Sequence, residues 1–201
     1  IGHDEYVRLF GLAVEDHDRA VALDPGNADA LFKRGLSFYD RGALANEAGV
    51  DHRPWFESAR ADFAKALERE PRHALAWDYL GLVDEQTDRM DEAIADFTRL
   101  TAIDAKRGRA RLADAYCTRG QSNLREKRYG PAAADLEKSV EIGAPADGCS
   151  CEPYNTLAFL YVDAQPQYEK AWDLVHKAQR SGRPIAPEYV ERLKKTSGRQ
   201  R

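Results

Sequence analysis

Large and small apolar residues recur along the chain at spacings of three and four, which place them on one stripe of an α-helix. Four segments begin with a large apolar residue that is followed, four places later, by glycine or alanine. They are 31–35, 77–81, 116–120 and 154–158. The small residue lets a second helix come close, and aromatic residues fill the space between the two helices. We therefore expect each segment to be the first helix of a hairpin.

A second pattern follows each of these segments: an alanine, a large residue four places on, and a third residue three places later. The copies begin at Ala59, Ala93, Ala132 and Ala171, and another at Ala13 opens the chain. Prolines fall where helices would start or stop, and the alternation of apolar and polar residues that marks a strand never persists. The pattern predicts an all-α chain of antiparallel helical hairpins.

These motifs resemble the tetratricopeptide repeat (TPR), a helix–turn–helix unit of about 34 residues. Residues 76–81, followed by Ala93 and Phe97, are close to that family's consensus over a whole unit. Ala59 and Ala93 are 34 residues apart. The resemblance covers roughly residues 5–180 and implies a right-handed superhelical stack of hairpins, an α-solenoid.

The expected organisation is a single TPR-like domain over residues 1–201. Its segments are an unpaired helix at 4–24, repeats at 28–72, 73–105 and 106–145, a divergent repeat at 151–182 and a capping helix at 186–196. Gly35 and Gly81 are 46 residues apart, so we expect an insertion at about 42–53 in the first full repeat. Trp55, just after it, is either an exposed anchor for a partner or the start of a packed helix.

The resemblance also implies where a partner would bind, because in this family the first helix of each hairpin lines a concave groove. The expected groove stripe is Phe32, Leu36, Tyr39, Asp78, Leu82, Glu85, Cys117, Gln121, Arg125, Asn155, Phe159 and Val162. This stripe is apolar at one end, acidic in the middle and mixed at the other. It suits an extended or helical peptide with an apolar anchor and a basic flank.

Some members of the family hold the terminal carboxylate of chaperones with a clamp of lysine, asparagine and arginine. The matching positions here are Phe32, Leu36, Tyr79, Asp114 and Thr118. They lack the required cations and amide, so we expect no such clamp.

Charge gives little reason to expect a nucleic acid or a membrane as partner. The 201 residues carry a net charge of −4, and no apolar run approaches the roughly 18 residues that span a bilayer. The basic cluster at 106–111 could contact phosphate, but no aromatic residues interleave with it. The solvated first turn of a helix is the simpler interpretation.

The chain has three cysteines, which is not the disulfide framework of a small secreted protein and favours a reducing, cytoplasmic compartment. Cys149 and Cys151 could offer two thiolates to zinc or form a redox disulfide, but no second ligand pair accompanies them. Cys117 is expected to be a small packed residue of a helix. No nucleotide, metal or nucleophile motif is found, so no cofactor is expected.

The resulting prediction is a non-catalytic protein–protein interaction module that binds a peptide or a partner protein in the groove, as a scaffold or adaptor. Two alternatives stay open. One is a thiol- or metal-dependent site at Cys149 and Cys151. The other is self-association through the terminal helices, which would give a homo-oligomer.

Overall fold

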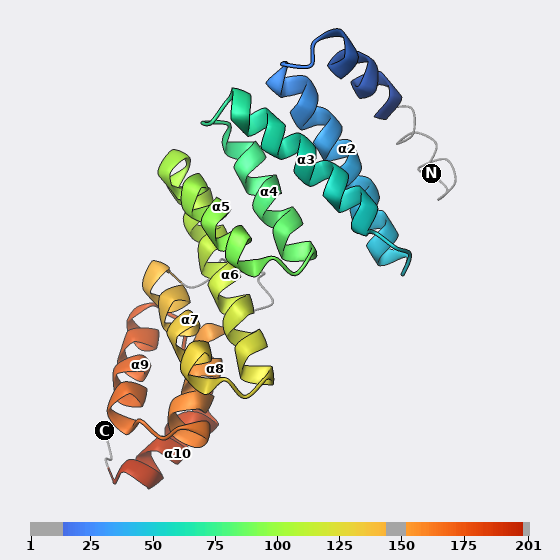
Figure 1. Ribbon diagram of the computed structural model, residues 1–201. Helices are drawn as coiled ribbons and strands as arrows, with labels where there is room; N and C mark the ends of the chain where they lie inside the picture. The colour runs from blue at the N-terminus through green and yellow to red at the C-terminus, as the bar shows by residue number, and fades with distance from the viewer. Residues whose placement is uncertain (1–13, 144–151, 199–201) are drawn as a thin grey trace. The chain divides into compact units, whose positions relative to one another are not determined.

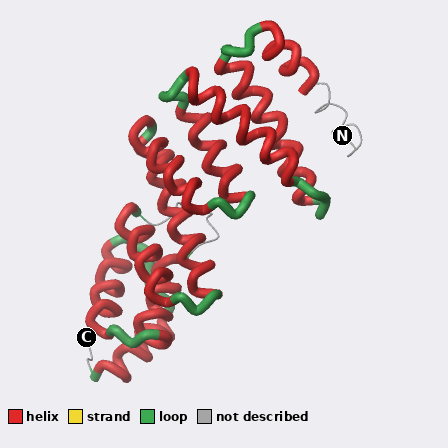
Figure 2. Tube along the Cα trace, viewed as in Figure 1, coloured by secondary structure: helices red, strands yellow, loops and turns green. Residues whose placement is uncertain are grey.

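The computed structural model describes residues 14–143 and 152–198, and regular structure in those ranges is helical (Figures 1 and 2). No strand occurs among the described residues, and consecutive helices pack as antiparallel pairs, so the predicted fold class is confirmed. After a helix at 14–23, the elements are α2 (Ala28–Glu47), α3 (Arg53–Arg69), α4 (Ala74–Gln86), α5 (Met90–Ile103), α6 (Ala105–Arg125), α7 (Tyr129–Ile142), α8 (Pro153–Phe159), a π-helical turn (Leu160–Ala164), α9 (Tyr168–Arg180) and α10 (Pro187–Ser197).

The chain forms two compact units, Ile1–Gly108 and Arg109–Arg201, and each is described by itself. In the first unit α2 packs on α3, α3 on α4 and α4 on α5, so that one hairpin is stacked on the next. The helix at 14–23 also packs on α2. Asp18 forms an ion pair with Arg34 at 2.8 Å, and the ring of His17 is hydrogen-bonded to the hydroxyl of Ser37 at 3.2 Å.

Two turns of the first unit start a helix in the same way. The side chain of Asn27 accepts a hydrogen bond from the N–H of Ala30 at 2.9 Å, and that of His73 accepts one from the N–H of Ala76 at 3.1 Å. Each bond satisfies an N–H that the helix itself leaves unpaired. A proline stands shortly before each cap, where the sequence pattern predicted that one helix stops before the next begins.

Glycines mark the points where the two helices of a hairpin cross. A Cβ atom placed on Gly35 would lie 2.7 Å from the ring of Phe63, and one on Gly81 would lie 2.4 Å from the ring of Phe97. Both phenylalanines are fully buried. Any side chain at these glycines would therefore displace a ring that the core holds in place.

The insertion expected at 42–53 is mostly helix rather than loop. The helix α2 has 20 residues and continues to Glu47 before a short turn leads into α3. A Cβ atom on Gly42 would lie 2.8 Å from the ring of Phe56. The crossing contact of Gly35 and Phe63 is therefore repeated seven residues later in α2 and seven residues earlier in the antiparallel α3. Because seven residues are about two helical turns, the extra residues lengthen the hairpin and keep the same face inward.

An ion pair accompanies the glycine contact in two hairpins. Arg34 donates to both carboxylate oxygens of Asp62 at 2.7 Å, and Arg119 donates to those of Asp135 at 2.9 and 2.6 Å. Each arginine directly precedes the glycine of its hairpin, and each aspartate directly precedes the large residue that meets that glycine. This spacing of arginine, glycine, aspartate and large residue is present in the sequence.

The hairpin of α4 and α5 lacks the arginine. Leu80 stands in its place, so Asp96 lies beside Asp84 instead of beside a guanidinium. Asp84 is fully buried and accepts hydrogen bonds from Arg60 at 2.7 Å and Arg89 at 2.9 Å. Burial, followed by the charge of Asp84, raises the pKa of Asp96 to about 7, although Arg60 opposes this and Glu92 adds to it only slightly.

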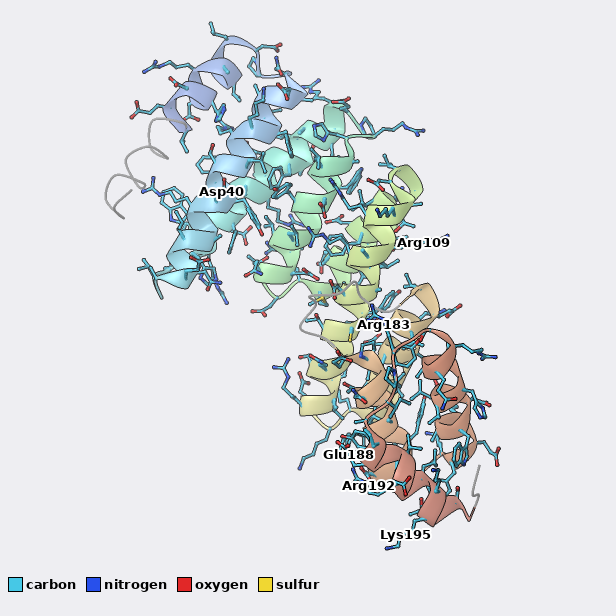
Figure 3. The ribbon with its side chains drawn as sticks, turned by 180° about the vertical axis from the view of Figure 1, so that it is seen from behind. Asp40, Arg109, Arg183, Glu188, Arg192 and Lys195 are labelled. Carbon is cyan, nitrogen blue, oxygen red and sulfur yellow. The ribbon has the colours of Figure 1, made fainter. Side chains whose placement is uncertain are left out.

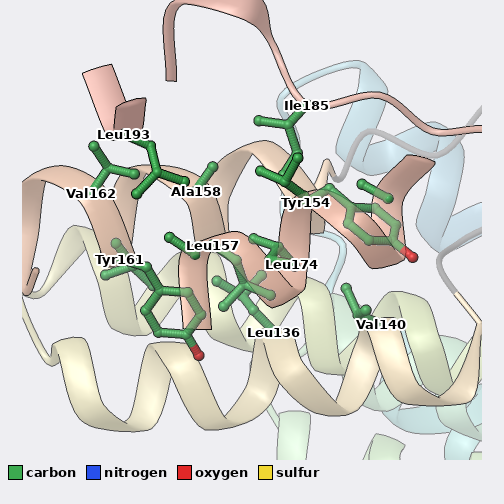
Figure 4. Packing of buried hydrophobic residues seen from close by; sticks show 14 of the residues in the cluster. Leu136, Val140, Tyr154, Leu157, Ala158, Tyr161, Val162, Leu174, Ile185 and Leu193 are labelled. Carbon is green, nitrogen blue, oxygen red and sulfur yellow. The ribbon is translucent and has the colours of Figure 1, made fainter. Parts of the chain in front are cut away.

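The second unit has its core among α7, α8, the π-helical turn and α9 (Figure 4). The π-helical turn buries Leu160, Tyr161 and Val162 in succession. The helix α10 closes this core with Leu193, which is fully buried, and presents charged residues outward (Figure 3). The exposed charged residues labelled there along α10 are Glu188, Arg192 and Lys195.

We predict that Gly81→Ala lowers the free energy of unfolding by about 1–3 kcal/mol, because its methyl group must displace the buried ring of Phe97. Chemical denaturation measures this difference. Gly130→Ala is the matched control, since nothing lies within 4 Å of its added methyl group and alanine favours the helix. If Gly130→Ala lost as much stability as Gly81→Ala, the loss would not come from the close contact between Gly81 and the ring of Phe97.

The neighbouring carboxyls give a prediction on pH. Since the pKa of Asp96 is raised on folding, its protonated form stabilises the native state at low pH, and this contribution is lost as pH rises to about 7. Asn resembles the protonated acid, so Asp96→Asn should match the wild type at about pH 4 and exceed it on the order of 2 kcal/mol at about pH 8.

Thermal and urea unfolding across this pH range, with Asp62→Asn as the reference, test the prediction. Asp62→Asn removes a satisfied partner of Arg34 and should destabilise the chain at about pH 8. If Asp96→Asn is also less stable than the wild type at about pH 8, then ionised Asp96 does not destabilise the native state and the prediction is wrong.

Candidate functional site

The helices α2 and α4 run side by side in the first unit with a constant register. The rings of Tyr39 and Tyr79 are 5.2 Å apart, and the amide of Asn46 donates to that of Gln86 at 3.5 Å. Both contacts join residues 40 positions apart in the sequence, so the two helices keep one register over about two turns.

Partly exposed side chains follow this register on both helices. We call the set formed by Leu36, Tyr39, Tyr79, Leu82 and Glu85 the α2–α4 face; all five are half-buried. Leu36, Tyr39 and Tyr79 pack against the core of the first unit with one side and remain accessible on the other. Four of the five were predicted from the sequence, and Tyr79 was placed there only as a clamp position.

Two residues of the predicted groove stripe in this unit are not exposed. Phe32 is buried among Phe63, His73 and Tyr79, with its ring 4.5 Å from that of His73. Asp78 is buried and lies 3.8 Å from the guanidinium of Arg107. The expectation that they form part of an exposed stripe is wrong, because stacked hairpins fill this level of the groove with their own side chains.

The stripe positions of the second unit have mixed surroundings. Cys117 and Val162 are buried, Gln121 is half-buried, and Arg125 is exposed. The amide oxygen of Asn155 accepts a hydrogen bond from the N–H of Ala186 at 2.8 Å, which ties α8 to the start of α10. Phe159 is exposed to 36%. In this unit only some of the predicted positions are therefore available to a partner.

Trp55 belongs to a packed helix. It is half-buried near the start of α3, with its ring stacked against that of Phe38 at 6.3 Å. The guanidinium of Arg41 lies 3.9 Å from the ring centroid, where a cation–π attraction holds it. Of the two interpretations of Trp55, the structure favours the start of a packed helix.

The basic cluster at 106–111 lies in the first turns of α6, where the solvated-helix interpretation placed it. Lys106 and Arg109 are exposed. Arg107 lies between Asp78, at 3.8 Å, and Asp104, at 4.0 Å, so its charge is shared with carboxylates of its own unit. This arrangement gives a structural role to one of the cluster's cations.

Cys117 is a fully buried residue of α6, as expected, and it is also disulfide-bonded. Cys149 and Cys151 lie outside the described residues. A disulfide forms and persists in oxidising surroundings, so it weighs against the reducing compartment that the cysteine count favoured. Among the residues that the structure describes, no three His, Cys, Asp or Glu side chains are placed to hold a metal ion.

Within the described ranges, no helix is both long and apolar enough to cross a membrane. The geometry thus consists of stacked hairpins, a partly apolar face on the first unit and small hollows on the second.

Solved structures with the same arrangement are numerous. A crystal structure of MamA superposes with a TM-score of 0.52 and 18% identity, covering 98% of both chains. YrrB, described as a TPR protein with an unusual peptide-binding site, gives 0.53 and 17% over 96% of this chain and 86% of its own. Human IFIT1, solved as a dimer with PPP-AAAA, gives 0.60 and 18% over 94% of this chain and 44% of its own. At these identities the likeness concerns the fold.

A search of curated proteins found no significant match. The family model described as "Tetratricopeptide repeat" matches residues 6–51 and 56–110, which together make up half of the chain. The second matched range contains residues 76–81, Ala93 and Phe97, the motif that resembles the family's consensus. The chain therefore belongs to the tetratricopeptide repeat family.

Proposed function

We propose that this protein is an interaction module that binds a segment of a partner protein on the α2–α4 face. Domains of this family are in general protein–protein interaction modules, and the finer assignment of a binding face is our own. One observation carries it: the contacts of Tyr39 with Tyr79 and of Asn46 with Gln86 keep α2 and α4 in one register. Partly exposed apolar side chains on both helices thereby form one surface.

The packing of this face favours binding energetically. The rings of Tyr39 and Tyr79 are already held by each other and by Phe56 and Phe63, at centroid distances between 5.2 and 5.8 Å. A partner therefore does not have to order them, and little conformational entropy is lost when they are covered. Tyrosines placed in this way are common at the energetic centre of protein interfaces.

The charge of the α2–α4 face determines which charge we expect on the partner segment. Asp78, which was expected to make the groove acidic, is buried beside Arg107. Glu85 is the remaining acidic member of the face. We therefore propose a partner segment anchored mainly by an apolar side chain.

The test selects peptides on the purified protein from a random peptide library and measures the affinity of the selected peptides by fluorescence anisotropy. Leu82→Asp should weaken them about tenfold or more, because it places a charge against the apolar anchor. Phe32→Asp is unsuitable as a probe, since Phe32 belongs to the core and its loss would unfold the unit.

Leu23→Asp is the matched control, because it makes the same chemical change at a side chain that is 89% exposed and lies outside the face. Its thermal unfolding and its affinity should equal those of the wild type. Selected peptides that bind Leu82→Asp as tightly as the wild type would show that the α2–α4 face is not the binding surface.

A further inference from the structure

Two adjoining hollows in the second unit are lined by residues of α7, of α8 with its π-helical turn, and of α9 with the turn that follows it. Their volumes are about 260 and 440 Å³, and they share Val140 and Lys177 as lining residues. The floor of the smaller hollow is apolar, with Val140, Leu157 and Leu174 all buried (Figure 4). An aliphatic side chain placed there would cover this floor.

The charges of the smaller hollow are largely balanced. Lys170 lies 3.1 Å from the carboxylate of Glu137, which also accepts a hydrogen bond from the hydroxyl of Tyr161. Burial raises the pKa of Tyr161, and its bond to Glu137 raises it further, so this hydroxyl remains a donor. Glu137 is thus occupied by two donors of its own unit.

The larger hollow is different, because its charged lining is entirely cationic among the described residues. Lys177, Arg180 and Arg183 line it, together with Tyr154 and Ser181, and no described carboxylate does. The exposed Lys177 and Arg180 form no ion pair within 4 Å with a described residue. This local excess of positive charge stands out in a chain whose net charge is −4.

Lys177 and Arg180 lie in the last turn of α9, and the turn that follows them is fixed by hydrogen bonds. After α9, the N–H of Arg183 donates to the carbonyl of Ala178 at 3.0 Å, and Gly182 supplies the left-handed residue with a φ of 70°. The hydroxyl of Ser181 donates to that of Tyr154 at 3.1 Å, which fixes the turn to α8. The cations therefore extend from a backbone that is already in place before a ligand arrives.

The end of α9 accounts for part of this charge. The carbonyl end of a helix carries about half a negative charge and attracts cations such as Lys177 and Arg180. Lys177 and Arg180 together carry two positive charges, which exceed this half charge. The remaining positive charge is available to a carboxylate, which arginine recognises with two parallel hydrogen bonds.

We propose that the α7–α9 hollows bind an acidic peptide segment of a partner protein, with its carboxylates at Lys177 and Arg180 and an aliphatic side chain on Val140, Leu157 and Leu174. The apolar floor favours a peptide over a phosphate, because a phosphate would leave that floor uncovered. This surface is separate from the α2–α4 face, and the two proposals stand or fall independently.

Fluorescence anisotropy at low salt tests the proposal with a fluorescein-labelled peptide, acetyl-Asp-Asp-Leu-Asp-Asp. The double variant Lys177→Gln and Arg180→Gln should weaken it about tenfold. The double variant Arg128→Gln and Lys195→Gln is the control, because it removes the same charge at exposed sites of the same unit outside the hollows. It should leave the affinity within about twofold of the wild type.

Two further probes test whether the apolar floor contributes to binding and whether inorganic phosphate can replace the carboxylates of the peptide. The peptide with Ser in place of Leu should bind more weakly, and inorganic phosphate should compete poorly. Leu82→Asp should have no effect, which separates this site from the α2–α4 face. The proposal is overturned if the labelled peptide shows no saturable binding, if both double variants weaken it equally, or if the Ser peptide binds as well as the Leu peptide.

Discussion

The close crossing of two helices at a glycine is the contact on which the rest of this structure depends. Gly35, Gly42 and Gly81 each face a phenylalanine ring at a distance that leaves no room for a Cβ atom. Because the ring fills the space that the missing side chain leaves, the hairpin is held at one depth and one angle. The register of α2 beside α4, and hence the α2–α4 face, follows from these crossings.

Polar groups near the crossings add specificity more than stability. The pairs Arg34–Asp62 and Arg119–Asp135 satisfy carboxylates that the packing of two helices would otherwise desolvate. Where leucine replaces the arginine, the half-buried Asp96 lies beside Asp84, and its pKa is raised to about 7. The aspartate is thus present in all three hairpins, and the residue before the glycine decides whether an arginine of the same hairpin pairs with it.

The two units differ in which of their surfaces remain accessible to solvent. In the first unit aromatic residues of neighbouring helices surround Phe32, so that it belongs to the core and the α2–α4 face is only partly exposed. In the second unit α10 covers α8 and its π-helical turn, while the hollows beside α9 stay accessible. The two proposed surfaces therefore differ in chemistry, since one is apolar and aromatic and the other is cationic with an apolar floor.

The sequence by itself determined the helices, the hairpins and the family, because glycine, alanine and aromatic residues at spacings of three and four admit few other folds. It also located most of the α2–α4 face, since helical periodicity places Leu36, Tyr39, Leu82 and Glu85 on one side of their helices. Only the tertiary structure decided that Phe32 and Asp78 are buried and that the extra residues lengthen α2. Burial and ion pairing depend on which residue of another helix lies opposite, and periodicity within one helix does not contain that information. Spacing along α9 places Lys177 and Arg180 on one side of the helix, but only the tertiary structure shows that Arg183, after the turn, lines the same hollow.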